Sequence, residues 1–311
     1  MLTLIQMNDF HNPVLLKRSV EGLKIKKNGF YVDSTYGGGG HSNEILKSLG
    51  KQGKLVAFDQ DDEAINENII RDERLIMMNN NFRYIKNCLN SIGISKIDGI
   101  IADLGISSHQ INTARGFSFN KEQDLDMRMN TNSKFSAQEI LNGYDKENLS
   151  RMLNEHSDFK NCDKLAEKLI SYRKTKKIIT SNDLINIFSG FYYYPKRNQF
   201  FARIFQAIRI EVNDEINALK ELLTTTLEIL KPGGRLVVIS YHSIEDRLVK
   251  NFMKFGHFKS FPQKDFFGNK FSPFNLINKK PLKASSRELM LNSRSRSAKL
   301  RIAELKAYEN E

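Results

Sequence analysis

The sequence DSTYGGGGHSNEIL, residues 33–46, places four consecutive glycines between an acidic residue and a predicted helix. The segment GFYVDS, residues 29–34, leads into it with the apolar and aromatic side chains typical of a β-strand. A glycine-rich turn between a first strand and a first helix lets the backbone approach a ligand closely, because glycine has no Cβ atom. The stretch therefore predicts a ligand-binding loop at the carboxyl end of a strand.

Further strand patterns alternate with helical patterns along the chain. Strands are predicted at residues 54–59, 74–79, 97–105 and 233–241, and helices begin at His41 and near Asp61. Apolar strands that alternate with helices are typical of a parallel sheet with helices on both faces. The sequence thus predicts an α/β fold with one mainly parallel sheet.

The middle of the chain has a different character. Residues 111–199 lack clear strand patterns, contain helical ones such as CDKLAEKLISYR, and interleave basic and aromatic residues in FYYYPKRNQFF. We predict a discontinuous α/β domain of residues 1–110 and 200–311, interrupted by a mostly helical insertion of residues 111–199.

Composition and charge narrow the class of protein. The chain has 311 residues, a formal net charge of +12 and a pI near 9.5, which favours a nucleic-acid partner, with solvated lysines as the alternative. Cys88 and Cys162 belong to no CxxC or Cys/His cluster, which argues against structural zinc and disulfides. Neither a membrane helix nor a signal peptide is predicted. We expect a cytoplasmic protein without a metal site; the sequence does not predict its oligomeric state.

Three ligands fit a glycine-rich first turn to different degrees. A P-loop requires Gly-Lys-Ser/Thr, but here His41 and Ser42 follow the glycines. A dinucleotide fingerprint requires a third glycine where Ser42 stands. S-adenosylmethionine fits better, because the Asp33 carboxylate favours its ammonium and sulfonium groups and would repel a pyrophosphate. A structural turn role for Asp33 is the alternative.

Three residues that follow predicted strands extend this candidate crevice. Asp59 lies about 20 positions after the glycines, where an acid accepts hydrogen bonds from ribose hydroxyls, although it also fits a helix N-cap. Phe82 follows the third strand and would cover adenine, although a core position is nearly as compatible. Asp103 ends the fourth strand, and an acid there is a site residue or a cap, because an unpaired buried carboxylate is costly.

Motifs along nearly the whole chain resemble one bacterial family. In family order they are HNPVLL (11–16), DSTYGGGGHS (33–42), DLGISSHQI (103–111), RGFSF (115–119), LDMRM (125–129), FQAIRIEVNDEI (205–216), LKPGGRLVVISYHSIEDRLVK (230–250) and NSRSRSAKLRIAE (292–304). The chain resembles the ribosomal RNA small subunit methyltransferase H family, which methylates the N4 amino group of a cytidine in 16S ribosomal RNA near the decoding (P-site) region. It departs from the family pattern at His109 and Ser293, where proline is usual, and at NQFFAR before Arg203.

The resemblance implies a class I, Rossmann-like methyltransferase fold with an inserted substrate domain and S-adenosyl-L-methionine as the cofactor. The cofactor contacts that it implies are Gly39, Gly40, His41, Asp59, Phe82, Asp103 and Gln110. His41 and Gln110 come from the resemblance alone, since by themselves they are typical of a helix start and of a polar surface. Asp33 is added as a further contact from the charge argument above.

The cytosine amine is a poor nucleophile because its lone pair is delocalised into the ring. Asp103 and the carbonyls of residues 104–105 are placed to accept its hydrogens, and the base would have to leave any stack. His242 ends the fifth strand and is a candidate proton acceptor, with packing behind a Ser243–Asp246 capping box as the alternative.

A Pro-Pro-aromatic motif, which DNA amino-methyltransferases carry after the fourth strand, is replaced here by DLGISS. Another aromatic side chain must therefore face the base. Phe117, Phe119 and Tyr241 are the candidates, and the sequence does not rank them.

For RNA, the helical insertion and the basic segment of residues 279–301 are the expected contact surfaces. The arginines predicted to meet phosphates are Arg128, Arg203, Arg209, Arg294 and Arg296. Such binding weakens as salt rises. For each of them a solvated surface position or a structural ion pair is the alternative.

Other functions remain open from the sequence. A methyltransferase of the same fold with another RNA or small-molecule substrate is the nearest, although the basic insertion argues against a small molecule. An NAD-dependent oxidoreductase is disfavoured by Asp33 and Ser42. A non-catalytic RNA-binding protein would not need a complete cofactor crevice.

Overall fold

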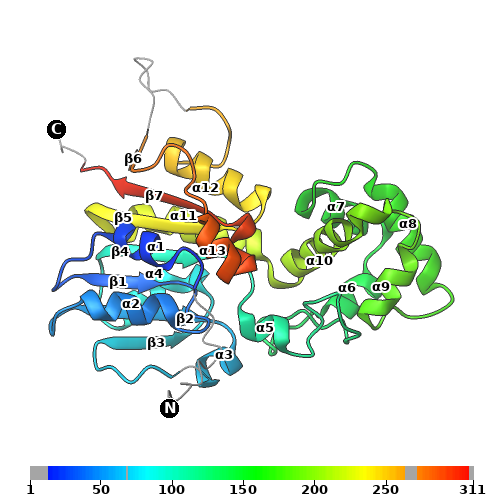
Figure 1. The fold of residues 1–311 in the computed structure, drawn as a ribbon, viewed down its shortest axis with the longest axis horizontal. Coiled ribbons are helices and arrows are strands. Elements are labelled where there is room, and N and C mark those ends of the chain that lie inside the picture. Colours follow the sequence, from blue (N-terminus) through cyan, green and yellow to red (C-terminus); the bar gives the residue numbers. More distant parts are fainter. Residues whose placement is uncertain (1–12, 68, 263–271, 308–311) are drawn as a thin grey trace, which may run out of the picture. The chain divides into compact units, whose positions relative to one another are not determined.

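The computed structural model describes residues 13–67, 69–262 and 272–307, so His11 of the first motif lies outside the described residues. The chain divides into two compact units (Figure 1). The sheet unit comprises Met1–Asp59, Glu63–Ser108 and Lys220–Glu311, and the helical unit comprises Gln60–Asp62 and His109–Leu219. In the described chain, no helix is long and apolar enough to cross a membrane.

The sheet unit contains one seven-stranded sheet within the described residues, in the order β3-β2-β1-β4-β5-β7-β6. Its strands are β1 (Phe30–Asp33), β2 (Lys54–Asp59), β3 (Leu75–Asn79), β4 (Ile97–Asp103), β5 (Leu230–Ser240), β6 (Phe274–Leu276) and β7 (Lys299–Leu305). The strands from β3 to β5 pair in parallel, and β7 is antiparallel to both of its neighbours. The predicted α/β class with a Rossmann-like, mainly parallel sheet is confirmed.

Helices accompany this sheet along the chain. They are α1 (Leu16–Leu23), α2 (Gly40–Ser48), α4 (Ile85–Ser91), α12 (Ser243–Phe255) and α13 (Ser286–Leu291). Two further helices, α3 (Asp62–Glu67) and α11 (Glu215–Ile229), begin in the helical unit and end in the sheet unit. On one face of the sheet, Val20 and Leu23 of α1 join a buried cluster with Val237 and Ile302. This apolar layer packs α1 against the strands whose carboxyl ends carry the candidate site.

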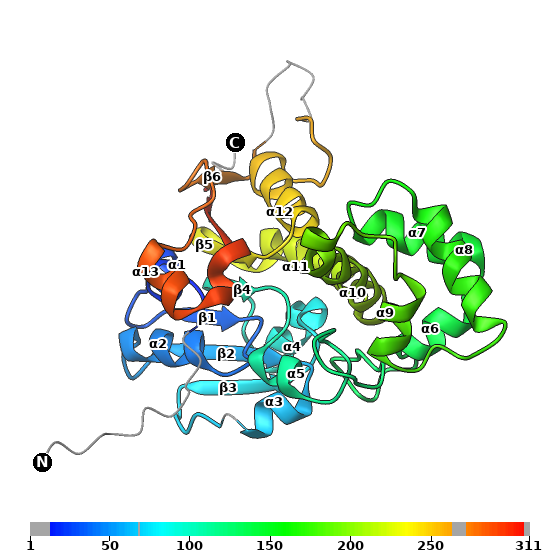
Figure 2. The ribbon, with the colours of Figure 1, turned by 45° about the vertical axis from the view of Figure 1, so that its right-hand side comes forward.

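The antiparallel strand β7 was not predicted, because its sequence KLRIAEL begins within the basic segment of residues 279–301 that we expected to contact RNA. Arg301 is only 7% exposed, and its Nε donates to Asp246 Oδ1 on α12 at 2.7 Å. Lys299 Nζ donates to the other oxygen of Asp246 at 3.2 Å. Helix α12 packs beside β5, β6 and β7 (Figure 2), so these cations are neutralised within the sheet unit.

The helical unit is built from amphipathic helices around its own core. Its helices are α5 (Ser108–Asn112), α6 (Ala137–Gly143), α7 (Lys146–His156), α8 (Cys162–Arg173), α9 (Ser181–Ile187) and α10 (Arg197–Asn213). Ser108, the first residue of α5, is counted with the sheet unit. The apolar face of α10, which includes Phe201, Ile204 and Ile208, is fully buried. Helix α10 packs on α7, so residues 200–219, which the sequence placed with the sheet, belong to the helical unit.

Candidate cofactor and active site

The glycine loop makes a tight turn from β1 into α2. Gly39 donates its backbone N–H to the Tyr36 carbonyl at 2.7 Å and has a left-handed φ of +71°. Gly37 also has a positive φ, of +51°, and donates its N–H to Asp59 Oδ2 at 2.8 Å. Asp59 at the end of β2, itself a predicted cofactor contact, therefore orders the glycine loop that follows β1.

Close neighbours leave no room for a side chain at two of the loop glycines. A Cβ atom on Gly40 would lie 2.0 Å from Pro13 Cγ, and one on Gly39 would lie 2.9 Å from the Tyr36 hydroxyl. A Cβ on Gly38 would meet nothing within 4 Å among the described residues. The loop is thus held close to the protein at Gly39 and Gly40 and is open at Gly38.

Replacing Gly40 with Ala is expected to weaken cofactor binding at least tenfold, because the 2.0 Å clash with Pro13 must displace the loop. Isothermal titration with S-adenosylhomocysteine would measure this change. The matched control is Gly38→Ala, because a Cβ there meets no atom of the described residues within 4 Å and so tests space that a ligand would fill. Equal binding by wild type and the Gly40 variant would contradict the assigned loop geometry.

Asp33 at the end of β1 is buried, with 1% of its surface exposed. Its Oδ2 accepts a hydrogen bond from Ser42 Oγ at 2.7 Å, and its Oδ1 accepts one from Thr35 N at 3.1 Å. Burial raises the pKa of Asp33, while the nearby His41 and these hydrogen bonds act in the opposite direction. Ser42, which displaced the third glycine of a dinucleotide motif, therefore serves to anchor Asp33.

Asp103 at the end of β4 is the acid with the most distinctive surroundings. Its Oδ1 accepts a hydrogen bond from Tyr241 Oη at 2.7 Å, and its Oδ2 lies 3.9 Å from His41 Nδ1. The side chain keeps 22% of its surface exposed. Burial raises the pKa of Asp103 to about 6, although His41 and the Tyr241 hydroxyl lower it. Asp103 is thus a carboxylate near neutral pH that is poised to take up a proton.

The two partners of Asp103 come from separate elements. His41, in the first turn of α2, is 5% exposed, and its buried Nε2 has no hydrogen-bond partner within the described part of the chain. Tyr241 follows β5, and burial followed by the charge of Asp103 raises its pKa well above the usual value. Its hydroxyl is therefore a donor to Asp103 at neutral pH.

These observations match the chemistry of the predicted cofactor. Within the described residues, the buried Nε2 of His41 has no hydrogen-bond partner and the loop is open at Gly38. Together with the acidic side chains of Asp33 and Asp103, these features suit a ligand that carries positive charge. The loop N–H of Gly37 is already bonded to Asp59, which does not suit a pyrophosphate cradle.

His242 occupies a helix cap, and the predicted Ser243–Asp246 capping box is wrong. The His242 Nδ1 accepts the Glu245 N–H at 3.4 Å, and Glu245 Oε2 accepts the N–H of His242 at 3.4 Å and of Tyr241 at 2.8 Å. Asp246 instead meets β7, as described above. Glu245 thereby fixes the turn that carries both Tyr241 and His242.

The remaining predicted contacts lie in different surroundings. Phe82 is half-buried at the start of a 3₁₀ turn (Phe82–Tyr84) after β3, where Asn81 Oδ1 accepts the N–H of Arg83 at 3.0 Å. Gln110 belongs to the helical unit, is 4% exposed, and donates its Nε2 to Asp61 Oδ2 at 3.0 Å. Among the described residues, the sheet unit therefore brings together Asp33, Gly39, Gly40, His41, Asp59 and Asp103, and Gln110 stands in the other unit.

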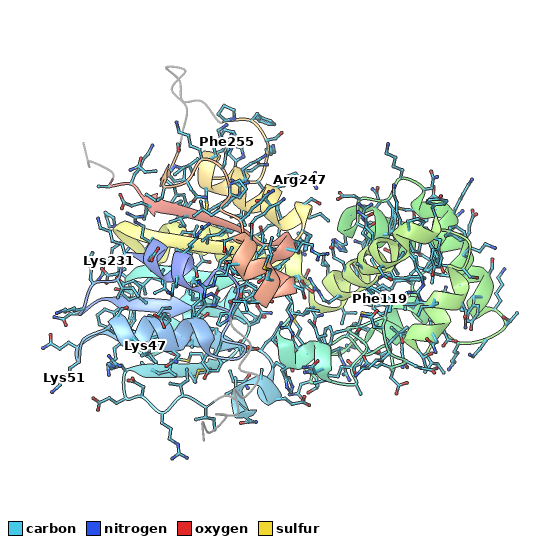
Figure 3. The ribbon with its side chains drawn as sticks, viewed as in Figure 1. Lys47, Lys51, Phe119, Lys231, Arg247 and Phe255 are labelled. Atoms are coloured by element: carbon cyan, nitrogen blue, oxygen red, sulfur yellow. The ribbon has the colours of Figure 1, made fainter. Side chains whose placement is uncertain are left out.

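Two of the candidate aromatics are engaged in the helical unit. Phe119 is labelled in Figure 3. Its ring centroid lies 6.1 Å from that of Phe201 and 5.6 Å from that of Phe205. Phe117 is 7% exposed, with the Arg115 guanidinium 5.8 Å from its ring centroid. Tyr241 is the candidate with a contact to a site acid, through Asp103.

The predicted RNA-binding arginines differ in their contacts. Arg128 donates to both oxygens of Asp126, and Arg209 donates to both oxygens of Glu215. The Arg203 guanidinium lies 6.0 Å from the Phe159 ring centroid. Arg294 is half-buried, and burial lowers its pKa, whereas Arg296 is exposed. Arg128 and Arg209 therefore already have structural partners.

Two positions with clear roles were missed or left unranked by the sequence. Thr35 accepts the Asp103 backbone N–H at its Oγ1 at 2.7 Å, and so joins β1 to the end of β4. Tyr241 was one of three unranked aromatics. Thr35 lies two residues after β1 and Tyr241 directly after β5, and this position at the carboxyl edge of the sheet is the signal that could have found them.

Comparison with known proteins places these features in a family. The model of the MraW methylase family matches residues 8–306. A ribosomal RNA small subunit methyltransferase H of Christiangramia forsetii is 52% identical over 296 residues, which cover 95% of this chain and 97% of the relative. A relative of the same name from Parabacteroides distasonis is 50% identical over 297 residues, with coverage of 95% and 97%. A third, from Flavobacterium psychrophilum, is 50% identical over 293 residues and is covered completely.

Proposed function

Because the chain belongs to the MraW methylase family, we propose that it transfers a methyl group from S-adenosylmethionine to the N4 amino group of a cytidine in 16S ribosomal RNA, near the decoding (P-site) region. The observation that carries the proposal is Asp103, whose carboxylate is held by Tyr241 at the edge of the sheet beside His41 of the glycine loop. The names of the relatives support a ribosomal RNA substrate, and the cytidine N4 position rests on the motif resemblance. The same proposal places the protein in the cytoplasm, where ribosomal subunits are assembled.

Most of the residues that would hold the cofactor belong to the sheet unit. Gly39, Gly40 and His41 would border it at the loop, Asp59 would accept hydrogen bonds from its ribose, and Asp33 would favour its positive charge. Phe82 after β3 would cover the adenine, and Gln110 is retained from the resemblance. When bound, S-adenosylmethionine supplies a methyl group on a positively charged sulfur, and that charge is lost on transfer.

Asp103 would prepare the acceptor nitrogen. One carboxylate oxygen accepts the hydrogen bond of the Tyr241 hydroxyl at 2.7 Å, and the other lies 3.9 Å from His41 Nδ1. A carboxylate held in this way can accept a hydrogen of the cytosine amine and so localise the nitrogen lone pair. As the new N–C bond forms, one N–H proton must leave, and a carboxyl group with a pKa of about 6 is suited to receive it.

His242 has a supporting place in this scheme. Because its imidazole caps α12 with Glu245, it holds the turn after β5 that carries Tyr241. We propose that it positions Tyr241, and that a direct role in proton transfer is secondary to this.

RNA would be bound by basic side chains of both units. Arg203 in the helical unit and Arg294 and Arg296 in the sheet unit are the arginines that we retain for direct contacts with phosphates. For Arg128 and Arg209, we propose that the ion pairs with Asp126 and Glu215 shape the RNA-binding surface. Binding is expected to weaken steeply with salt, because each phosphate contact releases counterions.

A thermal-shift titration separates this proposal from the oxidoreductase alternative. S-adenosylhomocysteine at 100 times its Kd is expected to add about 2.7 kcal/mol to the free energy of unfolding, whereas NAD is expected to add nothing. Stabilisation by NAD but not by S-adenosylhomocysteine would overturn the methyltransferase assignment.

The nucleotide that is methylated is tested by mass mapping of 16S RNA from a strain that lacks this gene. The expected result is the loss of one N4-methyl group from a cytidine near the P-site region, restored by the wild-type gene. An unchanged pattern of cytidine methylation, with a change in another RNA, would favour a same-fold enzyme with a different RNA substrate.

A further inference from the structure

Two adjacent tyrosines of the helical unit project into solvent. The exposed fractions of Tyr193 and Tyr194 are 76% and 84%. Their neighbour Tyr192 is packed instead, with its ring 5.7 Å from that of Phe200 and 5.3 Å from that of Phe201. The segment thus buries one aromatic ring and leaves the next two adjacent rings exposed, and adjacent exposed rings are a feature of binding surfaces.

The backbone that carries these tyrosines is held in place. The 3₁₀ turn Tyr194–Lys196 contains Pro195 and leads directly into α10, and the Lys196 N–H donates to the Tyr193 carbonyl at 2.8 Å. Proline fixes its own φ and reduces the freedom of the turn. The backbone that carries the two rings is therefore restricted by the proline and by this hydrogen bond, which lowers the entropy cost of binding.

The segment of chain that contains the tyrosines carries positive charge. The sequence contains no acidic residue between Asp183 and Glu211, whereas Lys196, Arg197 and Arg203 lie in that interval. Lys196 is exposed beside the tyrosines, and the Arg197 guanidinium lies 5.2 Å from the Phe201 ring centroid. Exposed aromatic rings next to cations are complementary to unpaired bases and the phosphates that join them.

We propose that Tyr193 and Tyr194, together with Lys196 and Arg197, form a stacking site for single-stranded RNA. The inference rests on the proposed RNA methyltransferase function and deepens it, because it names the form of RNA that the helical unit binds. Unpaired bases stack on the tyrosine rings, and the adjacent phosphates pair with the two cations. Duplex RNA keeps its base faces stacked on one another and binds this site more weakly.

A single tryptophan reports directly on stacking, since the chain contains none. In the Tyr193→Trp variant of the full chain, a 12-nucleotide oligoadenylate is expected to quench the indole fluorescence, and inorganic polyphosphate of equal charge is not. The matched control is Phe135→Trp, at another ring of the helical unit that is 55% exposed, with Lys134 Nζ 5.3 Å from its centroid. Equal quenching by polyphosphate, or equal quenching at both positions, would overturn the proposal.

Affinity provides the second test. Replacing both Tyr193 and Tyr194 with Ala is expected to weaken binding of the labelled oligoadenylate at least tenfold, and replacing both with Phe is expected to retain binding, because the ring and not the hydroxyl stacks. Fluorescence anisotropy at fixed salt measures both. Binding of S-adenosylhomocysteine should be unchanged in the double-alanine variant, which shows that the variant is folded.

The outcomes separate this inference from the proposed function. If S-adenosylhomocysteine fails to stabilise the wild type while oligoadenylate binding still depends on the tyrosines, the methyltransferase proposal fails and the stacking site stands. If the double-alanine variant binds oligoadenylate like the wild type but differs from it in sedimentation velocity, the tyrosines form an interface between copies of the chain. That result would overturn the stacking site.

Discussion

Replacing Asp103 with Asn is expected to lower the rate of methyl transfer about 10²–10³-fold while S-adenosylhomocysteine still binds, because the amide cannot take up the amine proton. The wild-type rate should fall as the pH decreases below about 6, since protonation of Asp103 removes the acceptor. Single-turnover methylation of 16S RNA, measured between pH 5 and 8, checks both statements. Full activity of the Asn variant would exclude Asp103 as the acceptor.

The same substitution is expected to stabilise the fold at pH 7. The carboxyl ionises near 3.8 in the unfolded chain and near 6 in the folded one, so ionisation of Asp103 disfavours the folded state as the pH rises between these values. Removal of the charge should therefore raise the free energy of unfolding by up to about 3 kcal/mol at pH 7, and by little below pH 4. Urea unfolding at the two pH values measures the difference.

The matched control for Asp103 is Tyr241→Phe, which keeps the ring and removes the hydroxyl. Because the hydrogen bond from Tyr241 lowers the pKa of Asp103, its loss should move the midpoint of the activity profile to higher pH. A purely structural role for Tyr241 would change the amplitude of the profile and leave its midpoint in place.

Replacing Asp246 with Ala is expected to lower the free energy of unfolding by about 3–5 kcal/mol, because it leaves the 7%-exposed Arg301 without its carboxylate. Burial alone would raise the pKa of Asp246, but Arg301 and Lys299 outweigh it and hold the pKa below its usual value. The stabilisation is therefore present above the unfolded pKa near 3.8 and is lost as the pH falls through the lower folded value. Urea unfolding at pH 7 and at pH 3 measures it.

Two further variants separate the buried pair from ion pairs in general. Glu44→Gln removes a carboxylate that meets Lys47 on the exposed side of α2, with side-chain exposures of 34% and 63%, and should change stability little. Asp246→Leu combined with Arg301→Met replaces both charges with apolar groups and should recover much of the loss. Wild-type stability of the Asp246→Ala variant would contradict the assigned pairing of α12 with β7.

The acids of the candidate site could be predicted because their position depends on local sequence alone. Asp33, Asp59 and Asp103 each follow a short apolar run, and the carboxyl ends of parallel strands meet at one edge of the sheet. The strand predicted at residues 54–59 coincides with β2, and the one at 97–105 ends two residues beyond β4. The alternation of strand and helix patterns, the apolar content of the strands and the glycine turn were sufficient to predict these strands and the acids at their ends.

Contacts between distant segments could not be predicted in this way. Tyr241 bonds to Asp103, which lies 138 positions away in the sequence. Tyr241 could be preferred to Phe117 and Phe119 as the aromatic residue of the site only once the structure had shown that β5 lies beside β4. The cap of α12 was assigned to Ser243, because hydroxyl side chains are the preferred caps, whereas the backbone turn gave that place to His242.

The sequence by itself determined the parallel sheet, the glycine loop and the row of acids at its edge, because each follows from side-chain patterns within a few residues. Only the tertiary structure decided that the basic segment around Arg301 is an antiparallel strand of the sheet. A run of lysines and arginines is typical of a solvated surface until a carboxylate is found to neutralise it. Here that carboxylate is Asp246, 55 positions earlier in the chain. Because the two residues are so far apart in the sequence, the ion pair that makes burial of Arg301 favourable could not be predicted from local patterns.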